Sequence, residues 1–227
     1  IGPLSSLWRN ARKAKLFPEA STVIATKKLV GFAQIKINKR LGTIFLPSVD
    51  MHLDFGGIAK GYIAQWVINF LKANGIQQAL VDAGGDIVMS GAPLNQQGWL
   101  IGVNLPETTD DLLNKKLQLS NCSVATSGDV YQFIEYKGVK YSHIINPLTG
   151  YGVTNLRNVT IVAKTGATAD WLATACSILP IKEAKQLAIS HQAALLITTL
   201  KNGKLVFEAT PNFKNYWQTT NIIQGKK

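Results

Sequence analysis

The chain has 227 residues, of which 46% are hydrophobic and 16% charged, so it can bury a sizeable core as one domain, or as one domain with a smaller lobe. Its formal net charge of +11 suits nucleic acid, anionic lipid or a phosphate-bearing ligand. The basic residues are scattered, however, and no RNA-recognition, zinc-finger or helix-turn-helix pattern accompanies them. We therefore interpret most of them as a solvated surface.

The first half of the chain predicts short elements separated by turns. Apolar spacing predicts a helix that Pro18 ends, and later a longer helix that Asn74-Gly75 ends. Alternation of apolar and polar residues predicts strands between these helices. In chain order the expected elements are a helix over 4–15, short strands within 22–47 with a turn near 38–42, a loop over 54–57, the longer helix after it, and buried strands over 79–81 and 99–103.

The second half predicts more strands than helices. A turn at Lys137-Gly138 suits a hairpin, and Pro180 ends a helix. In chain order we expect a strand over 117–125, a hairpin of 132–136 and 141–145, a strand over 159–163, helices over 169–179 and 182–190, and strands over 193–198 and 204–207. Strands and helices without strict alternation predict an α+β fold, with a largely mixed sheet and flanking helices.

Two cysteines, Cys122 and Cys176, belong to no CxxC pair and have no histidine at zinc spacing. A disulfide between them is one possibility, and two buried free thiols are the interpretation we favour. No uncharged apolar segment is long enough to span a bilayer. The opening Ile1-Gly2-Pro3-Leu4 lacks an initiating Met and a signal peptide, so we expect a processed product or a fragment.

A first candidate site is the segment D-F-G-G-I-A-K-G-Y at residues 54–62. Its glycines let the backbone approach a ligand closely, and Lys60, in the first turn of the following helix, can serve as a point charge for a phosphate. The spacing of a Walker loop is absent. A plain glycine turn before an amphipathic helix explains this segment equally well.

A second candidate is D-A-G-G-D at residues 82–86, where a strand ending in two glycines and an acid could present backbone N–H groups to a ligand. In isolation, an ordinary tight turn capped by Asp86 is the better interpretation. A third runs from S-G-D at 127–129 to Y-S-H-I-I-N-P-L-T-G at 141–150. There His143 lies on a strand between apolar neighbours, where a histidine is more often a core residue, and Asn146-Pro147 is typical of a turn.

A fourth candidate is A-D-W-L-A-T at residues 169–174. Asp170 and Thr174 are four positions apart on the expected helix, so their side chains share one face. A carboxylate and a hydroxyl oxygen are hard ligands suited to Mg²⁺, which takes one or two protein carboxylates and completes its shell with water and phosphate. Alternatively, Asp170 only favours the positive end of its helix.

Together, in this order, the segments resemble the FAD:protein FMN transferases, or ApbE-type flavin transferases. The family shows D-L-G-G-I-A-K-G-Y, V-x-x-G-G-D-I, T-S-G-D, S-H-I-I-D-P-x-T-G and A-D-x-x-A-T, and the opening Gly2-Pro3-Leu4 with Trp8 resembles its G-P-L-x-x-L-W. The resemblance covers essentially residues 1–227, as one ApbE-like domain that makes up the C-terminal two-thirds of the family length. Position 146 departs from the pattern, since Asn replaces the usual Asp and cannot take up a proton.

The resemblance implies a Mg²⁺-dependent transfer of FMN from FAD to a Thr or Ser hydroxyl of an acceptor protein, with release of AMP. FAD contacts are implied for Asp54, Lys60, Asp86, His143 and Ile144. Metal ligands are implied at Gly57, through its backbone oxygen, and at Asp170 and Thr174, through their side chains. Catalytic roles are nominated for Asp170 and for His143, the latter in proton handling or positioning.

Family resemblance also implies an acceptor in a membrane redox complex and a place on the periplasmic side of the bacterial inner membrane, where a lipoprotein anchor holds the full-length protein. Because the basic residues are scattered and no binding motif accompanies them, we expect no nucleic-acid partner. FAD hydrolysis to FMN and AMP, or FAD binding without catalysis, are the alternative activities. The segment T-G-A-T at 165–168 resembles the family's acceptor motif. We interpret it as a structural turn, and self-flavinylation is the competing hypothesis.

Overall fold

The computed structural model describes residues 1–104, 115–128, 132–155, 157–201 and 203–218. The chain divides into two compact units. Unit 1 comprises residues 1–56 and 129–156, and unit 2 comprises residues 57–128 and 157–227. The expectation of one ApbE-like domain over residues 1–227 stays a prediction. Within the described residues, no helix combines the length and apolar character needed to cross a bilayer.

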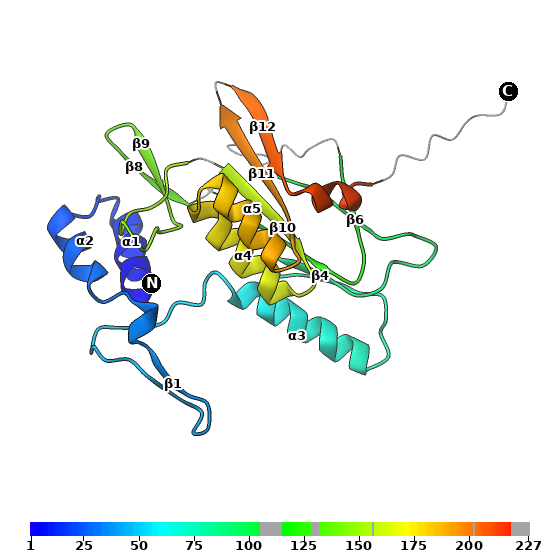
Figure 1. Ribbon diagram of the computed structural model, residues 1–227, viewed down its shortest axis with the longest axis horizontal. Helices are drawn as coiled ribbons and strands as arrows, with labels where there is room; N and C mark the ends of the chain where they lie inside the picture. The colour runs from blue at the N-terminus through cyan, green and yellow to red at the C-terminus, as the bar shows by residue number, and fades with distance from the viewer. Residues whose placement is uncertain (105–114, 129–131, 156, 202, 219–227) are drawn as a thin grey trace. The chain divides into compact units, whose positions relative to one another are not determined.

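Unit 2 is built on a six-stranded sheet in the order β12-β11-β10-β7-β4-β3, and each of its strand pairs is antiparallel (Figure 1). The α+β class is thus confirmed, although the sheet is antiparallel rather than mixed in the part of the chain that is described. Its strands are β3 (Leu80–Asp82), β4 (Ile87–Met89), β7 (Ser123–Ser127), β10 (Arg157–Ala163), β11 (Ala194–Lys201) and β12 (Lys204–Ala209).

Strand β10 is buried at each of its seven positions, because both faces of the sheet are covered. Val159 and Ile161 point to a core with helices α4 (Gly166–Ile178) and α5 (Ile181–Ser190), while Val162 points to the opposite core. This second core includes the paired strands β5 (Trp99–Ile101) and β6 (Leu117–Leu119) and the short helix η2 (Pro211–Tyr216). A strand that is covered on both faces has a nearly continuous run of apolar residues in its sequence, and for this reason β10 could be predicted well.

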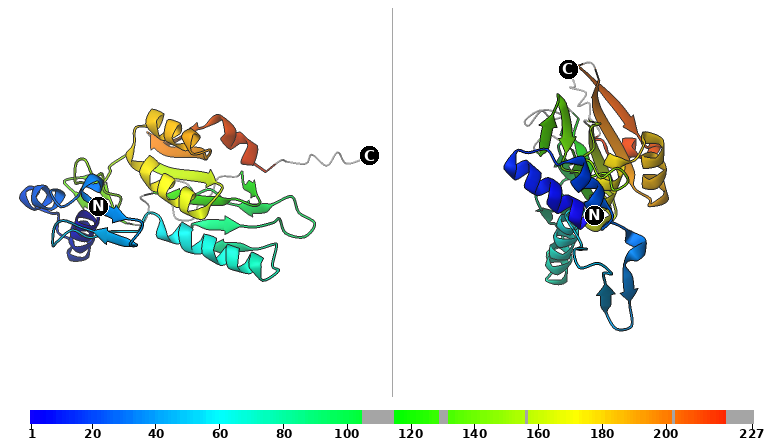
Figure 2. Two further views of the ribbon diagram at one scale, coloured as in Figure 1. Left: turned by 60° about the horizontal axis from the view of Figure 1, so that its bottom comes forward. Right: turned by 90° about the vertical axis from the view of Figure 1, so that its left-hand side faces the viewer.

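Helix α3 (Ala59–Ala73) packs against α4 and against strands β3 and β4, so it lies along the edge of the sheet that these two strands form (Figure 2). Ala64 and Ile68 form a small core with Val88 of β4. The opposite face of α3 is apolar too, and its large side chains are exposed there, including Trp66 stacked on Phe70. The start of α4 lies beside the start of α3, because Gly166 contacts Gly61 of α3 and Val88 of β4.

Unit 1 has its own core, centred on a buried Trp8 whose indole N–H donates to the Gly150 carbonyl at 2.8 Å. Phe17, Tyr141 and Tyr151 contact its ring. The elements around this core are α1 (Gly2–Ala14), α2 (Ala20–Lys27), η1 (Phe32–Gln34), the hairpin of β1 (Lys36–Asn38) and β2 (Thr43–Phe45), and the hairpin of β8 (Phe133–Tyr136) and β9 (Val139–Ser142).

Several expectations were wrong in detail. Residues 20–27 form a helix rather than a strand, because burial of Val23 against Leu4 and Trp8 overrides the local β-branched composition. The expected strand over 117–125 is two strands, separated by Asn121 in a left-handed conformation with φ 50°. Strand β4 was missed. The remaining expected helices and strands are present, with ends that shift by a few residues.

Candidate functional site

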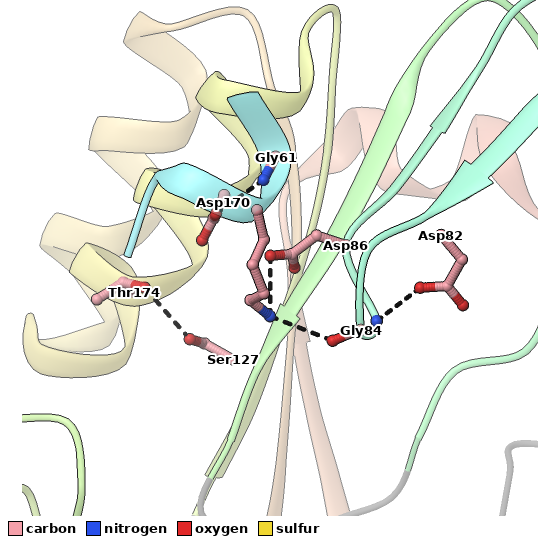
Figure 3. A network of polar contacts seen from close by, with 9 residues as sticks. Gly61, Asp82, Gly84, Asp86, Ser127, Asp170 and Thr174 are labelled. Atoms are coloured by element: carbon pink, nitrogen blue, oxygen red, sulfur yellow. Dashed lines mark hydrogen bonds and ion pairs between the residues drawn. The ribbon is translucent and has the colours of Figure 1, made fainter. Parts of the chain in front are cut away.

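The turn between β3 and β4 supplies the first part of the site. Gly84 and Gly85 have φ of 66° and 92°, which only glycine adopts readily, and the Asp82 carboxylate accepts the Gly85 N–H at 2.7 Å. Asp82 thus caps this turn, and the expectation that Asp86 caps it was wrong. The Asp86 side chain takes no part in this cap and points toward α3 and α4 (Figure 3).

Lys60, in the first turn of α3, reaches this turn. Its ammonium group lies 3.0 Å from Asp86 Oδ2 and donates to the Gly84 carbonyl at 3.2 Å. The Lys60 side chain is 47% exposed, whereas the Asp86 side chain is 4% exposed. Lys60 therefore pairs with a buried carboxylate, while its own side chain remains accessible to an anionic ligand from solvent.

Asp170 lies in the first half of α4, and its residue is 4% exposed. Its Oδ2 accepts the N–H of Gly61, near the start of α3, at 3.0 Å. The suggestion that Asp170 serves only the positive end of its own helix was incomplete, because this carboxylate satisfies a free N–H of the neighbouring helix. Residues 109 positions apart in sequence are joined by this contact.

Two carboxylates thus lie near one another in a buried setting. Burial raises the pKa of Asp86 to about 6; the hydrogen bond from Lys60 opposes this rise, and the negative charge of Asp170 adds to it. Two carboxylates beside one ammonium group leave the site with a net negative charge. Such a site favours an additional cation.

Thr174 adds a hydroxyl one turn further along α4. Its Oγ1 lies 3.4 Å from the Ser127 hydroxyl at the end of β7 (Figure 3). Gly57 lies against the same side chain, since a Cβ at Gly57 would come within 3.0 Å of Thr174 Oγ1. The sequence placed Ser127 in the T-S-G-D segment without naming it as a site residue, and its contact with Thr174 depends on the β7–α4 packing.

The structure therefore brings five of the predicted residues together in unit 2: Gly57, Lys60, Asp86, Asp170 and Thr174. No group of three or more His, Cys, Asp or Glu side chains suited to a metal occurs in the described residues. Mg²⁺ does not require such a group, because one or two carboxylates with hydroxyl, carbonyl, water and phosphate oxygens suffice. The donor set fits Mg²⁺.

The other predicted residues belong to unit 1. Asp54 accepts the Gly56 N–H at 2.7 Å and pairs with Arg9 at 3.4 Å. Burial alone would raise the pKa of Asp54, but the bonds from Gly56 and Ser5 and the charge of Arg9 outweigh it and lower the pKa. This carboxylate is held in its charged form.

His143 follows β9 and lies outside the strand on which it was expected. Its backbone N–H donates to the Gln132 carbonyl at 2.8 Å. The Ile144 N–H donates to the Ser142 hydroxyl, and the Ile144 carbonyl accepts from Val153, so this backbone is engaged within unit 1. Asn146 Oδ1 accepts the Leu148 N–H at 2.9 Å. Either Asn or Asp can cap a turn in this way, so the turn tolerates Asn at this position.

The T-G-A-T segment begins helix α4. Thr165 is the N-cap residue, and its hydroxyl accepts the Thr168 N–H at 3.3 Å and donates to the Thr168 hydroxyl at 2.8 Å. A structural role is thus confirmed, as a helix cap rather than an isolated turn. The cap also explains why α4 begins at Gly166, three residues before its expected start.

Fold and site together define a class: an α+β protein whose sheet edge and two helix N-termini gather hard oxygen donors and a lysine, as in sites that hold a divalent cation with a phosphorylated ligand. The model of the ApbE family matches residues 1–197. The chain belongs to the ApbE family.

Relatives of known function and structure agree with this assignment. The chain is 28% identical to an FAD:protein FMN transferase of Vibrio cholerae over 95% of its length and 32% identical to that of Treponema pallidum over 79%. It spans 65% and 53% of these two relatives. The crystal structure of an ApbE protein from Thermotoga maritima superposes with a TM-score of 0.85 at 28% identity, covering 96% of this chain and 71% of that one.

Proposed function

We propose that the protein transfers FMN from FAD to a Thr or Ser hydroxyl of an acceptor protein and releases AMP. The observation that carries this proposal is the convergence of the solvent-accessible Lys60 with the buried carboxylates of Asp86 and Asp170, in a chain whose relatives are named FAD:protein FMN transferases. Phosphoryl transfer requires mainly positioning and neutralisation of charge, which this donor set is suited to supply.

In the proposed reaction, the acceptor oxygen attacks the phosphorus of the FMN half of FAD. A P–O bond to the acceptor forms, the P–O bond to the AMP phosphate breaks, and AMP leaves with its electron pair. The acceptor hydroxyl loses its proton to a base, and no group is oxidised or reduced. We nominate His143 to handle or position this proton, because a neutral imidazole can accept it near pH 7.

Mg²⁺ would be held by the Gly57 backbone oxygen together with the side chains of Asp170 and Thr174. Bound there, it would supply neutralisation of charge on the diphosphate. Lys60 would donate to a phosphate oxygen, and Asp86 would hold the Lys60 ammonium group in place through their 3.0 Å contact. Asp54 and the Ile144 backbone are proposed to contact FAD.

The acceptor is proposed to be a flavinylated subunit of a membrane redox complex. The full-length protein is proposed to lie on the periplasmic side of the bacterial inner membrane, attached by a lipid anchor. Labelling of intact cells with a membrane-impermeant reagent, followed by fractionation, tests this location. Recovery of the protein in the soluble cytoplasmic fraction would contradict it.

The reaction is tested by incubating the chain with FAD, Mg²⁺ and a Thr-containing acceptor peptide. We expect AMP by chromatography and a fluorescent peptide with the added mass of FMN. Asp170→Asn keeps an oxygen that can accept the Gly61 N–H but removes the charge, so it should lower turnover by at least about a hundredfold. Glu183→Gln, which also removes one charge but lies on the exposed face of α5, is the matched control.

Each alternative has a distinct outcome. AMP without modified peptide would favour FAD hydrolysis, and bound FAD without AMP would favour a binding protein. A modified chain in place of a modified peptide would favour self-flavinylation. Undiminished transfer by Asp170→Asn would remove this carboxylate from the mechanism.

A further inference from the structure

The N-terminal ends of α3 and α4 cap one another. The Gly61 N–H of α3 donates to Asp170 of α4 at 3.0 Å, and the Gly166 N–H of α4 donates to Gln65 Oε1 of α3 at 3.0 Å. Gly61 and Gln65 are four residues apart on one helix, and so are Gly166 and Asp170 on the other. Each helix therefore supplies one N–H and one side-chain oxygen from a single face.

The two hydrogen bonds satisfy N–H groups that have no partner within their own helices. Between the two bonds, the backbones touch, because a Cβ at Gly61 would lie 2.1 Å from the Gly166 carbonyl oxygen. Two bonds on either side of a backbone contact restrict both sliding and rotation of α4 against α3. The Gln65 bond therefore helps to fix the face of α4 that carries Asp170 and Thr174.

Gln65 is itself held in orientation. Its Nε2 donates to Asn69 Oδ1 at 3.0 Å, one turn further along α3. This contact directs Oε1, rather than the amide nitrogen, at the Gly166 N–H. In the sequence, Gln65 belongs to no glycine-rich motif and carries no charge that would indicate a function. Its role as an acceptor arises only where the two helices meet.

We propose that Gln65 is a positioning residue for the donor set on α4, acting through the Gly166 N–H. The proposal rests on the proposed function in one respect, namely that Asp170 and Thr174 hold a divalent cation. Residues that orient metal ligands typically change metal affinity by 10- to 100-fold when they are substituted. Gln65 touches no ligand atom, so we place its effect at the lower end of that range.

The test uses Mn²⁺ as the probe, with free ion measured by electron paramagnetic resonance on the full chain. Gln65→Leu removes the acceptor and should weaken Mn²⁺ binding by about tenfold. Gln65→Glu keeps an acceptor oxygen and should bind at least as tightly as the unsubstituted chain. Gln77→Leu is the matched control, because Gln77 contacts the Lys72 carbonyl at the far end of α3, and it should leave binding unchanged.

A second readout is independent of the metal. Hydrogen exchange at the Gly166 N–H should become faster in Gln65→Leu, and exchange at the Gly61 N–H should follow, because a displaced α4 withdraws Asp170 from it. Should Gln65→Leu fail to fold, Gln65→Asn, which is one methylene too short to keep the bond, carries the same expectations.

The outcomes separate the two proposals. If the unsubstituted chain binds no Mn²⁺, the proposed metal site fails, and the role of Gln65 in positioning α4 is decided by exchange at Gly61. If Mn²⁺ binds with equal affinity in Gln65→Leu and exchange at Gly61 is unchanged, Gln65 has no positioning role. Equal weakening by Gln65→Leu and Gln65→Glu would also overturn the proposal, since the retained acceptor would then be irrelevant.

Discussion

The contact between Gly61 and Gly166 gives the sharpest test of how the site is assembled. In Gly61→Ala the new Cβ would lie 2.1 Å from the Gly166 carbonyl oxygen, 2.5 Å from its carbon and 2.9 Å from Asp170 Cβ. Two of these three atoms belong to backbone, so no rotamer change can relieve the overlap. The helices must separate by about 1.3 Å to reach ordinary contact distance.

Three contributions determine the expected change in the free energy of unfolding. Overpacking of a close contact costs about 1–3 kcal/mol, and a backbone overlap lies at the upper end. Stretching of the buried Gly61–Asp170 bond adds about 1–2 kcal/mol. Ala is favoured over Gly within a helix by about 1 kcal/mol, which partly offsets this loss. We therefore expect Gly61→Ala to destabilise the protein by about 3 kcal/mol.

Equilibrium unfolding in urea, followed by circular dichroism, measures this change at constant m-value. Ile63→Ala is the control, because Ile63 is exposed on the same helix and the substitution gains helix propensity without entering the contact. Its unfolding free energy should stay within about 0.5 kcal/mol of the unsubstituted value. If Gly61→Ala were as stable as the control, the close approach of α3 and α4 would be refuted.

Three further predictions concern buried or paired groups. Burial raises the pKa of Cys122 and of Cys176 to about 11, so both thiols should react at pH 8 at least tenfold faster with a disulfide reagent in guanidinium than in the native protein, and equal rates would contradict this. The Arg157 guanidinium donates to the Cys176 and Leu179 carbonyls at the end of α4, so Arg157→Gln should destabilise the protein by about 2–3 kcal/mol in the same urea assay; a change under 0.5 kcal/mol would exclude this role. The hydrogen bond from Lys185 lowers the pKa of Glu208, so the pair should contribute stability above the usual Glu pKa and lose it as the pH falls through the lowered value. Lys185→Met should therefore cost no more than about 1 kcal/mol at pH 7 and nothing near pH 2, and a difference that persisted in acid would point to packing instead.

Local chemistry explains why parts of the fold were predictable. The hairpin turn at Lys137-Gly138 has φ of 51° and 76°, positive at both residues as a two-residue hairpin turn requires, and glycine at the second position adopts this conformation readily. Helix α3 has apolar residues at helical spacing and ends where Asn74-Gly75 predicts. In contrast, α2 has a weak local preference, and burial of Val23 among residues distant in sequence decides its conformation.

The same distinction between local and tertiary determinants applies to the candidate site. Glycine patterns and the Asp170/Thr174 spacing identify its members, because each has a local signature. Their mutual contacts have none: the Gly61–Asp170 bond, the proximity of Asp86 to Asp170 and the Gln65–Gly166 bond arise only where α3, α4 and the β3–β4 turn meet. The sequence accordingly predicted that Asp86 caps the turn. Asp82 caps it instead, and Asp86 pairs with Lys60.

The charges of the site lead to a last prediction, which concerns cooperativity. Asp86 and Asp170 with Lys60 carry one net negative charge, so a divalent cation alone would leave the site positive and a diphosphate alone would leave it strongly negative. Both together restore the single negative charge, which the N-termini of α3 and α4, at about half a positive charge each, offset. Under the proposed function, Mg²⁺ should therefore tighten FAD binding by at least about fivefold, and FAD should tighten Mg²⁺ binding by the same factor. Titration calorimetry in each order measures both factors, and FAD affinity that did not change with Mg²⁺ would mean that the cation and the diphosphate do not share this site.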